Sequence, residues 1–216
     1  MTTPSPASHD PVSWSTHWET SNTPWDHARA PPATVALLQS GQIPAGNGRV
    51  LVPGCGRGYD AFAAAEHLKG VTEVVGMDTA EVATEEARKV QQTVPSDSAN
   101  LVTFQTGDFF TYKPPQPYDV VIDHTFLCAM PPVIRDDWAR KMAEVLAVGG
   151  RLVTYMYPLA SHEGGPPYAL SLDLYDQLLL KYFDQVHIED VVERFHKNKE
   201  TIGEKVAVWK RKDVSV

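Results

Sequence analysis

Residues 49–60, Arg-Val-Leu-Val-Pro-Gly-Cys-Gly-Arg-Gly-Tyr-Asp, carry the clearest structural signal in this chain. The apolar run from Arg49 to Val52 predicts a buried strand, three glycines follow at alternate positions, and a helical pattern begins at Tyr59. Glycine suits such a turn because a Cβ would block a ligand that approaches the backbone, and because tight turns often need a positive φ. This order of strand, turn and helix is typical of an open α/β sheet that binds a nucleotide-like ligand.

A second strand ends in a carboxylate twenty residues beyond the last of these glycines. Residues 74–77 are largely apolar, and Asp78 follows them. An acid at this place can accept hydrogen bonds from both hydroxyls of a ribose. The sequence therefore predicts a nucleoside cofactor at the carboxyl ends of parallel strands, with Gly54, Gly56 and Asp78 among its binding residues.

The spacing of the glycines indicates which nucleoside is bound. The run is G-x-G-x-G followed by Tyr59 and Asp60, whereas a dinucleotide site has G-x-G-x-x-G and a P-loop has a Lys-Ser/Thr pair. An acidic residue at a helix start repels a phosphate but suits an ammonium group. S-adenosylmethionine has a cationic amino-acid end and no phosphate, so it fits this pattern. The alternative is an ordinary tight turn between a strand and a helix.

Length and composition restrict the kinds of protein that this chain can be. A chain of 216 residues is long enough for one domain with a substantial core, and 43% hydrophobic content is ordinary for a globular protein. The net charge of −8, without a basic stripe, argues against a nucleic-acid partner. Two cysteines exclude a disulfide framework, and we find neither a signal peptide nor an apolar run of about 20 residues. We predict a cytoplasmic monomer that does not enter a membrane.

Strand and helix patterns alternate along the chain. Residues 1–12, rich in Pro, Ser and Thr at their start, predict a disordered tail, and 13–216 predict a single domain. The predicted strands are 49–53, 72–78, 101–106, 118–123, 150–157, 184–192 and 205–211. The predicted helices are 33–39, 59–68, 80–92, 133–147 (closed by Gly149-Gly150) and 171–182. We therefore expect an α/β fold with a seven-stranded, mostly parallel sheet, helices on both faces, and an antiparallel edge hairpin linked by residues 196–201.

Further motifs stand along nearly the whole chain. They are Trp14-x3-Trp18-Glu19, Thr23-Pro24-Trp25-Asp26, Arg29-Ala30, Gly107-Asp108-Phe109-Phe110, Asp123-His124-x-Phe126-x-Cys128-Ala129, Arg135, Trp138-Ala139, Met156-Tyr157-Pro158, His162, Gly164-Gly165-Pro166-Pro167-Tyr168, Glu204-Lys205 and Trp209-Lys210. With the glycine loop, they make the chain resemble the thiol and halide methyltransferases of the thiopurine S-methyltransferase family. This resemblance implies a Rossmann-like class I fold and methyl transfer from S-adenosylmethionine to a small thiol, a halide or thiocyanate. The chain departs from the family at His124, where plant members of this branch usually carry a tyrosine, and lacks an obvious arginine near Gly203.

The resemblance also suggests roles for site residues. Asp108 and Phe109 are expected to bracket the adenine, although Asp108 after a glycine also suits a plain turn. His124, at the end of a strand, is either a contact of the methyl donor, a base for a neutral thiol, or a histidine of the cleft wall. Tyr157 and Tyr168, on either side of a Gly-Pro-rich loop, are candidates for the acceptor wall or for packing. Cys128 is interpreted as a small buried hydrophobe, and we predict no metal site.

Three tryptophans precede the first predicted strand. Trp14 and Trp18 are four residues apart, so a short helix places both on one face. With Trp25 they either cover the sulfonium of the cofactor as a lid, with cation–π attraction, or anchor the segment to the core. We interpret residues 13–41 as a lid segment and Trp138, which lies in a helical pattern, as core.

Three other functions remain open from the sequence. An O- or S-methyltransferase that tailors a secondary metabolite would need a wider acceptor pocket. A pseudoenzyme that binds the cofactor would keep the glycine loop and Asp78 without turnover. An NAD-dependent dehydrogenase is disfavoured because the third glycine is at the wrong spacing.

Overall fold

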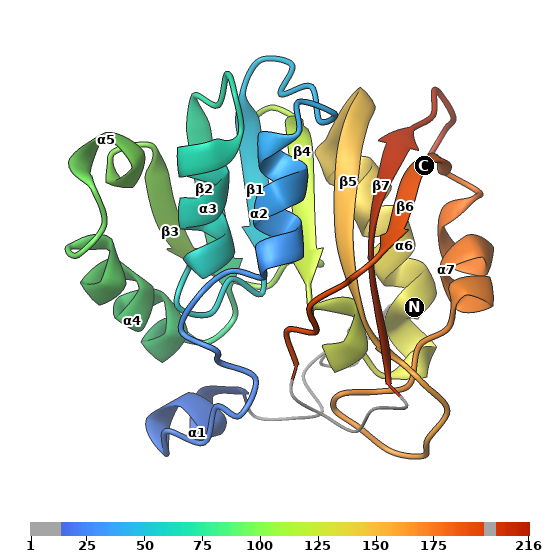
Figure 1. Ribbon diagram of the computed structural model, residues 1–216, viewed down its shortest axis with the longest axis horizontal. Helices are drawn as coiled ribbons and strands as arrows, with labels where there is room; N and C mark the ends of the chain where they lie inside the picture. The colour runs from blue at the N-terminus through green and yellow to red at the C-terminus, as the bar shows by residue number, and fades with distance from the viewer. Residues whose placement is uncertain (1–13, 197–201) are drawn as a thin grey trace, which may run out of the picture.

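Seven strands form one sheet in the computed structural model, which describes residues 14–196 and 202–216 (Figure 1). The strands are β1 (Arg49–Pro53), β2 (Glu73–Asp78), β3 (Val102–Thr106), β4 (Tyr118–His124), β5 (Leu146–Leu159), β6 (Phe183–Asp190) and β7 (Gly203–Arg211). The helices are α1 (Trp14–Glu19), α2 (Pro32–Gln39), α3 (Tyr59–His67), α4 (Glu81–Gln91), α5 (Ser96–Ala99), α6 (Arg135–Val145) and α7 (Leu172–Leu179). Short 3-10 turns η1 (Leu127–Ala129) and η2 (Pro132–Ile134) lead into α6.

The strand order creates a crevice in the middle of the sheet. The order is β3-β2-β1-β4-β5-β7-β6, with β1 to β5 parallel and β7 antiparallel to both β5 and β6. The chain winds outward from β1 to β3 and then returns to pair β4 with the other side of β1. In open α/β sheets, ligands bind where the order reverses in this way. The predicted fold, including the antiparallel edge hairpin, is confirmed.

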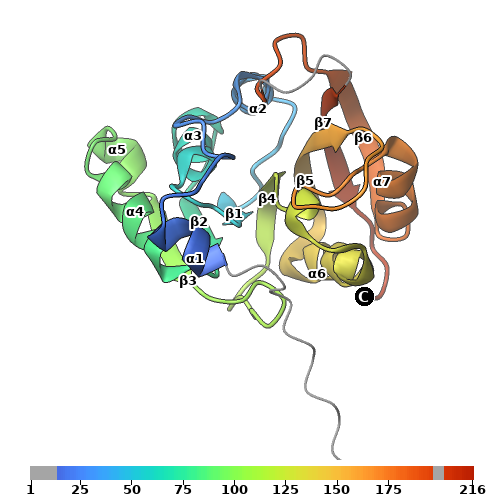
Figure 2. The same ribbon diagram turned by 90° about the horizontal axis from the view of Figure 1, so that it is seen from below.

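Helices cover both faces of the sheet, and two hydrophobic clusters lie beneath them. The cluster under α2 and α3 includes Leu37, Ala64 and Phe62, while the cluster under α6 and α7 includes Met142 and Leu178. Figure 2, which views the sheet from the end where α1 lies, shows α3 and α6 on opposite sides. The expectation of helices on both faces therefore holds. Helix α6 buries one side through Trp138, Ala139 and Met142, whereas α3 is buried at six consecutive residues, from Asp60 to Ala65.

The boundary between α6 and β5 differs from the sequence prediction. The helix ends at Val145 instead of residue 147, and Gly149-Gly150 lie inside the strand instead of closing the helix. Leu146 already pairs with Tyr118 of β4, and the register then shifts before Arg151 pairs with Val120. Gly149 has a φ of 79°, so the glycines allow the bulge that this shift requires. Helix α7 likewise ends three residues early, at Leu179. The predicted tail and most of the predicted 196–201 link lie outside the described residues.

Two buried tryptophans allow a matched test of the core. The Nε1 of Trp138 donates to the carboxylate of Asp123 at 2.9 Å, whereas the Nε1 of Trp209 donates to the hydroxyl of Thr154 at 3.0 Å. Burial raises the pKa of Asp123 to about 6, so this carboxylate is charged at pH 8. Bonds to charged partners contribute more than bonds to neutral ones. We expect Trp138→Phe to cost about 1 kcal/mol more than Trp209→Phe in the free energy of unfolding at pH 8.

Urea unfolding of both variants at pH 8 and pH 5 measures this difference. Below pH 6 Asp123 becomes neutral, so the extra cost of Trp138→Phe is expected to shrink. Equal costs at both pH values would contradict the account.

Candidate functional site

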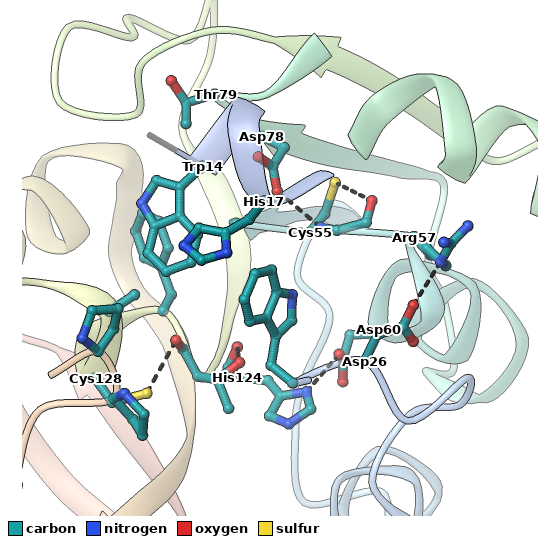
Figure 3. A pocket seen from close by; sticks show the side chains of 18 of the residues that line it. Trp14, His17, Asp26, Cys55, Arg57, Asp60, Asp78, Thr79, His124 and Cys128 are labelled. Carbon is teal, nitrogen blue, oxygen red and sulfur yellow. Dashed lines mark hydrogen bonds and ion pairs between the residues drawn. The ribbon is translucent and has the colours of Figure 1, made fainter. Parts of the chain in front are cut away.

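A cavity of about 770 Å³ opens at the carboxyl ends of the parallel strands. Its lining comes from α1 and the segment after it, the glycine loop, the ends of β2 and β4, the turn after β3, and residues around Pro166 and His196. Figure 3 shows side chains from these separate elements pointing toward one another. The cavity lies at the reversal of strand order, where the sequence predicted a cofactor.

The glycine loop is held by the carboxylate that the sequence assigned to a ribose. Asp78 is buried, and its Oδ2 accepts a hydrogen bond from the backbone N–H of Gly56 at 3.0 Å. Its Oδ1 accepts from the N–H of Ala80 at 3.0 Å. Burial raises the pKa of Asp78, and these N–H donors oppose the rise. The residue thus fixes the loop and also lines the cavity.

Asp108 and Phe109 lie together on the same side of the cavity. The Oδ1 of Asp108 accepts a hydrogen bond from the N–H of Phe110 at 2.9 Å, which is an Asx-type turn. Phe109 is buried and packs edge-on against Phe126, with ring centroids 5.4 Å apart. Asp108 therefore has the turn role that the sequence allowed, and both residues also line the cavity.

The tryptophans of the N-terminal segment cluster against the glycine loop. Trp14 and Trp18 each pack against Trp25, with centroids 5.3 Å and 6.3 Å apart. Trp18 is buried against Ala80 and Ala83 beside α4. All three tryptophans line the cavity, so the segment is anchored to the core and also forms part of the cavity wall.

His124 is paired with Asp60 across the floor of the cavity. Its Nδ1 lies 2.8 Å from the Asp60 Oδ2, and the two side chains are 11% and 12% exposed. His124 ends β4 and Asp60 lies in the first turn of α3, so the crossing of strand order brings them together (Figure 3). Asp60 was interpreted from the sequence as a partner for an ammonium group. Its pairing with a histidine 64 residues away was not foreseen.

A second histidine, His196, was missed by the sequence analysis. It is buried, and its ring stacks on Tyr157 with centroids 3.8 Å apart and planes 12° from parallel. His27 packs edge-on against it at 5.0 Å, and burial lowers the pKa of both histidines. Tyr157, predicted as an acceptor wall, therefore lies in the cavity beside His27 and His196. No local pattern marks these histidines, because their partners come from distant elements.

Glu204 holds this histidine segment in place. Its Oε1 accepts from the N–H of His196 at 3.0 Å and lies 3.3 Å from that residue's Nδ1. Its Oε2 accepts from the N–H of Phe195 at 2.9 Å and from the hydroxyl of Tyr155. The Glu204-Lys205 pair was part of the family resemblance, but its role was not predicted.

Of three other residues singled out from the sequence, only Cys128 lines the cavity. Tyr168, a predicted acceptor residue, does not line the cavity, and its ring lies 6.0 Å from the Arg135 guanidinium. His162 is exposed on the loop after β5. Cys128 is buried, and burial raises the pKa of its thiol. Within residues 14–196 and 202–216, no three His, Cys, Asp or Glu side chains are arranged to hold a metal ion, and no helix there is long and apolar enough to cross a membrane.

Comparison with known proteins places the chain in a family. The family model described as thiopurine S-methyltransferase matches residues 9–212, and the chain therefore belongs to that family. It is 37% identical over 204 residues to a probable thiol methyltransferase 2 of Arabidopsis thaliana, covering 92% of this chain and 84% of the relative. It is 40% identical over 178 residues to thiocyanate methyltransferase 1 of Brassica oleracea, covering 82% of this chain and 76% of that relative. The predicted resemblance to the thiol methyltransferase branch is confirmed, as is the prediction of a methyltransferase.

Solved structures agree on the fold. A 1,6-didemethyltoxoflavin-N1-methyltransferase of Burkholderia thailandensis, solved with S-adenosylhomocysteine, matches with a TM-score of 0.68 at 18% identity, over 92% of this chain and 85% of that one. An N-methyltransferase of Bradyrhizobium japonicum WM9 matches with a TM-score of 0.68 at 13% identity, over 91% and 98%. At these identities the likeness concerns the fold alone.

The role of Glu204 gives a prediction about stability and pH. Burial by itself raises the pKa of Glu204, but hydrogen bonds from His196, Tyr155 and Phe195 lower it to about 2. A fall from 4.5 to about 2 corresponds to about 3 kcal/mol of stability above pH 5, lost as the pH falls toward 2. Glu204→Gln should therefore lower the free energy of unfolding at pH 7 by up to about 3 kcal/mol.

In wild type the free energy of unfolding should decline between pH 5 and pH 2, and in Glu204→Gln this decline should be smaller. Thermal and urea unfolding across this range measure the effect, with Glu189→Gln on exposed β6 as the matched control. A variant as stable as wild type at pH 7 would contradict the assigned role.

Proposed function

We propose that this protein transfers a methyl group from S-adenosylmethionine to a small thiol, or to a small anion such as thiocyanate or a halide. One observation carries the proposal: a single cavity joins the glycine loop and Asp78 to a wall of aromatic and histidine side chains. The names of the relatives, thiol and thiocyanate methyltransferases, support this choice of acceptor. We also keep the predictions of a cytoplasmic location and of a monomer that acts on a small molecule.

The residues of the cavity fit the proposed cofactor. Gly56 lines the cavity without a side chain, and a Cβ there would only touch the ring of Trp18, at 3.4 Å. The Oδ1 of Asp60 is buried without a hydrogen-bond partner among the described residues, and an ammonium group is the natural donor for it. We assign the ribose to Asp78, the adenine to the Asp108–Phe109 side, and the cationic end to Asp60.

The wall opposite the glycine loop suits the methyl acceptor. When bound, S-adenosylmethionine supplies a sulfonium methyl group for in-line displacement. The chain must then orient the acceptor and keep water away. We assign the acceptor to the region between His124 and Tyr157, and we propose that residues 13–41 form a lid whose tryptophans Trp14, Trp18 and Trp25 shield the sulfonium. Tyr168 remains a candidate only for support of this wall from outside the cavity.

The first test is turnover with a panel of acceptors. We expect S-adenosylhomocysteine to form from S-adenosylmethionine when hydrosulfide, an alkyl thiol, an aryl thiol, thiocyanate or iodide is supplied. Formation is followed by chromatography, with each acceptor omitted in turn as the control. Tight cofactor binding with no turnover on any member would overturn the proposed acceptor class and favour a dedicated natural-product acceptor or a non-catalytic role.

The assignment of Asp78 is tested by binding. Asp78→Asn removes the charge and places an amide N–H against the N–H of Gly56, so we expect S-adenosylhomocysteine to bind at least about tenfold more weakly. Calorimetry measures the dissociation constant. Asp137→Asn on the exposed face of α6 is the matched control. Unchanged affinity in Asp78→Asn would refute the assignment.

A further inference from the structure

We infer that His124 and Asp60 act as a general-base pair that removes the proton of a neutral thiol. On this basis the preferred acceptor is a small thiol that is protonated at neutral pH, rather than an inorganic anion, which needs no base. The inference rests on the proposed methyltransferase function and narrows its acceptor.

The geometry defines which nitrogen is basic. The Nδ1 of His124 lies 2.8 Å from the Oδ2 of Asp60. A carboxylate only accepts hydrogen bonds, so Nδ1 carries a hydrogen and the neutral ring has its lone pair on Nε2. Asp60 therefore acts as a positioning residue that orients the ring and stabilises the imidazolium once the proton arrives. A histidine held by a carboxylate in this way is the arrangement of a general base.

The basic nitrogen, Nε2 of His124, makes no other interaction within the described residues that would account for its position. Nε2 of His124 is buried and has no hydrogen-bond partner among residues 14–196 and 202–216. A buried polar atom without a partner costs free energy, so such atoms are rare and often belong to a functional site. The ring lines the same cavity as the glycine loop. Because neighbouring groups cover Nε2, they must shift slightly before a thiol S–H can donate to this nitrogen.

The charge of the cavity wall favours a neutral acceptor. Four aspartates line the cavity (Asp26, Asp60, Asp78 and Asp108) against two arginines (Arg29 and Arg57). Arg57 is itself paired with Asp26 at 2.6 Å and with Glu86. Acidic surroundings attract the cationic methyl donor and repel an anion that enters as a free ion. A thiol that enters neutral and loses its proton inside the cavity avoids this repulsion.

Groups on every neighbouring element face the His124 ring. They are Asp60 on α3, Tyr155 on β5 with Glu204 behind it, Phe195 and His196 after β6, and His27. Asp123, the preceding residue of the same strand, points to the opposite face of the sheet, where Trp138 donates to it. Burial lowers the pKa of His27 and His196, which keeps both rings neutral at pH 7. His124 alone among the three histidines pairs with a carboxylate that also lines the cavity.

Atoms and electron pairs are conserved in the proposed proton and methyl transfer. The S–H bond of the thiol breaks and its proton moves to Nε2 of His124. The sulfur electron pair forms a bond to the methyl carbon, while the bond from that carbon to the donor sulfonium breaks and leaves its electrons on the donor sulfur. The products are a methyl thioether, S-adenosylhomocysteine and an imidazolium that later releases its proton to water.

The test compares a neutral and an anionic acceptor in the same enzyme. We use 2-mercaptoethanol, an alkyl thiol largely protonated at pH 7, and thiocyanate, and measure kcat/KM for wild type, His124→Gln and Asp60→Asn. His124→Gln should lower kcat/KM for the thiol by about 100-fold or more at pH 7. The loss with thiocyanate should be at least about tenfold smaller. Exposed His162→Gln is the matched control for both acceptors.

The pH profile separates a base from a structural role. With His124→Gln, thiol turnover should rise about tenfold per pH unit up to the thiol pKa, because only thiolate formed in solution reacts. Wild type should show a shallower profile, and Asp60→Asn should lie between the two. Melting temperature and S-adenosylhomocysteine affinity of each variant control for folding and for loss of the ammonium partner.

The outcomes distinguish the inference from the proposed function. Equal losses with both acceptors, or a thiol-specific loss in His196→Gln instead of His124→Gln, would overturn the general-base pair and leave methyl transfer intact. Wild-type turnover on thiocyanate alone would overturn it as well. No wild-type turnover on either acceptor would refute the proposed function itself.

Discussion

The turn after β1 lacks side chains at three positions, and aromatic rings from three distant parts of the chain occupy the space. A Cβ at the first glycine of 54–58 would lie 2.5 Å from Phe126, and one at the last would lie 2.5 Å from Phe104. At the middle glycine, Trp18 is 3.4 Å from the same point. All three glycines have positive φ values, which L side chains rarely adopt. The loop therefore fixes the N-terminal helix, β3 and the segment after β4 against one another.

Carboxylates connect the rest of the site to this loop. Asp78 accepts from the loop, Asp60 pairs with the end of β4, and Glu204 gathers the segment around His196. The three acids take their partners from different parts of the fold: the glycine loop, the end of β4 and the segment after β6. Since each buried carboxylate is hydrogen-bonded, the acidic edge is stable and still presents net negative charge to a cationic methyl donor.

Local patterns predicted the strands and helices well because burial on a sheet or helix face imposes a period that can be read without knowing the partner. The difference at Gly149-Gly150 has a specific cause. Two glycines after a helix usually mark its end, but here pairing of Leu146 with Tyr118 begins the strand earlier and uses the glycines as a bulge. For Tyr168 the sequence left the acceptor wall and packing open, and this residue does not line the cavity. Its position beside a Gly-Pro loop suggested exposure to a ligand, whereas the fold packs its ring against Arg135.

The order of residues along the chain was sufficient for the class of fold, the glycine loop, Asp78 and the family. The glycine loop and Asp78 depend on short spacings, and the fold class and the family depend on local patterns and motifs that can be read one after another along the chain. The pairing of His124 with Asp60, and the gathering of His27, Tyr157 and His196, depend instead on which strands become neighbours. Strand neighbours are set by long-range pairing across the sheet, which leaves no periodic trace in the sequence. The pairing of His124 with Asp60 and the cluster around His196 were therefore visible only after β4 was seen beside β1 and β7 beside β5.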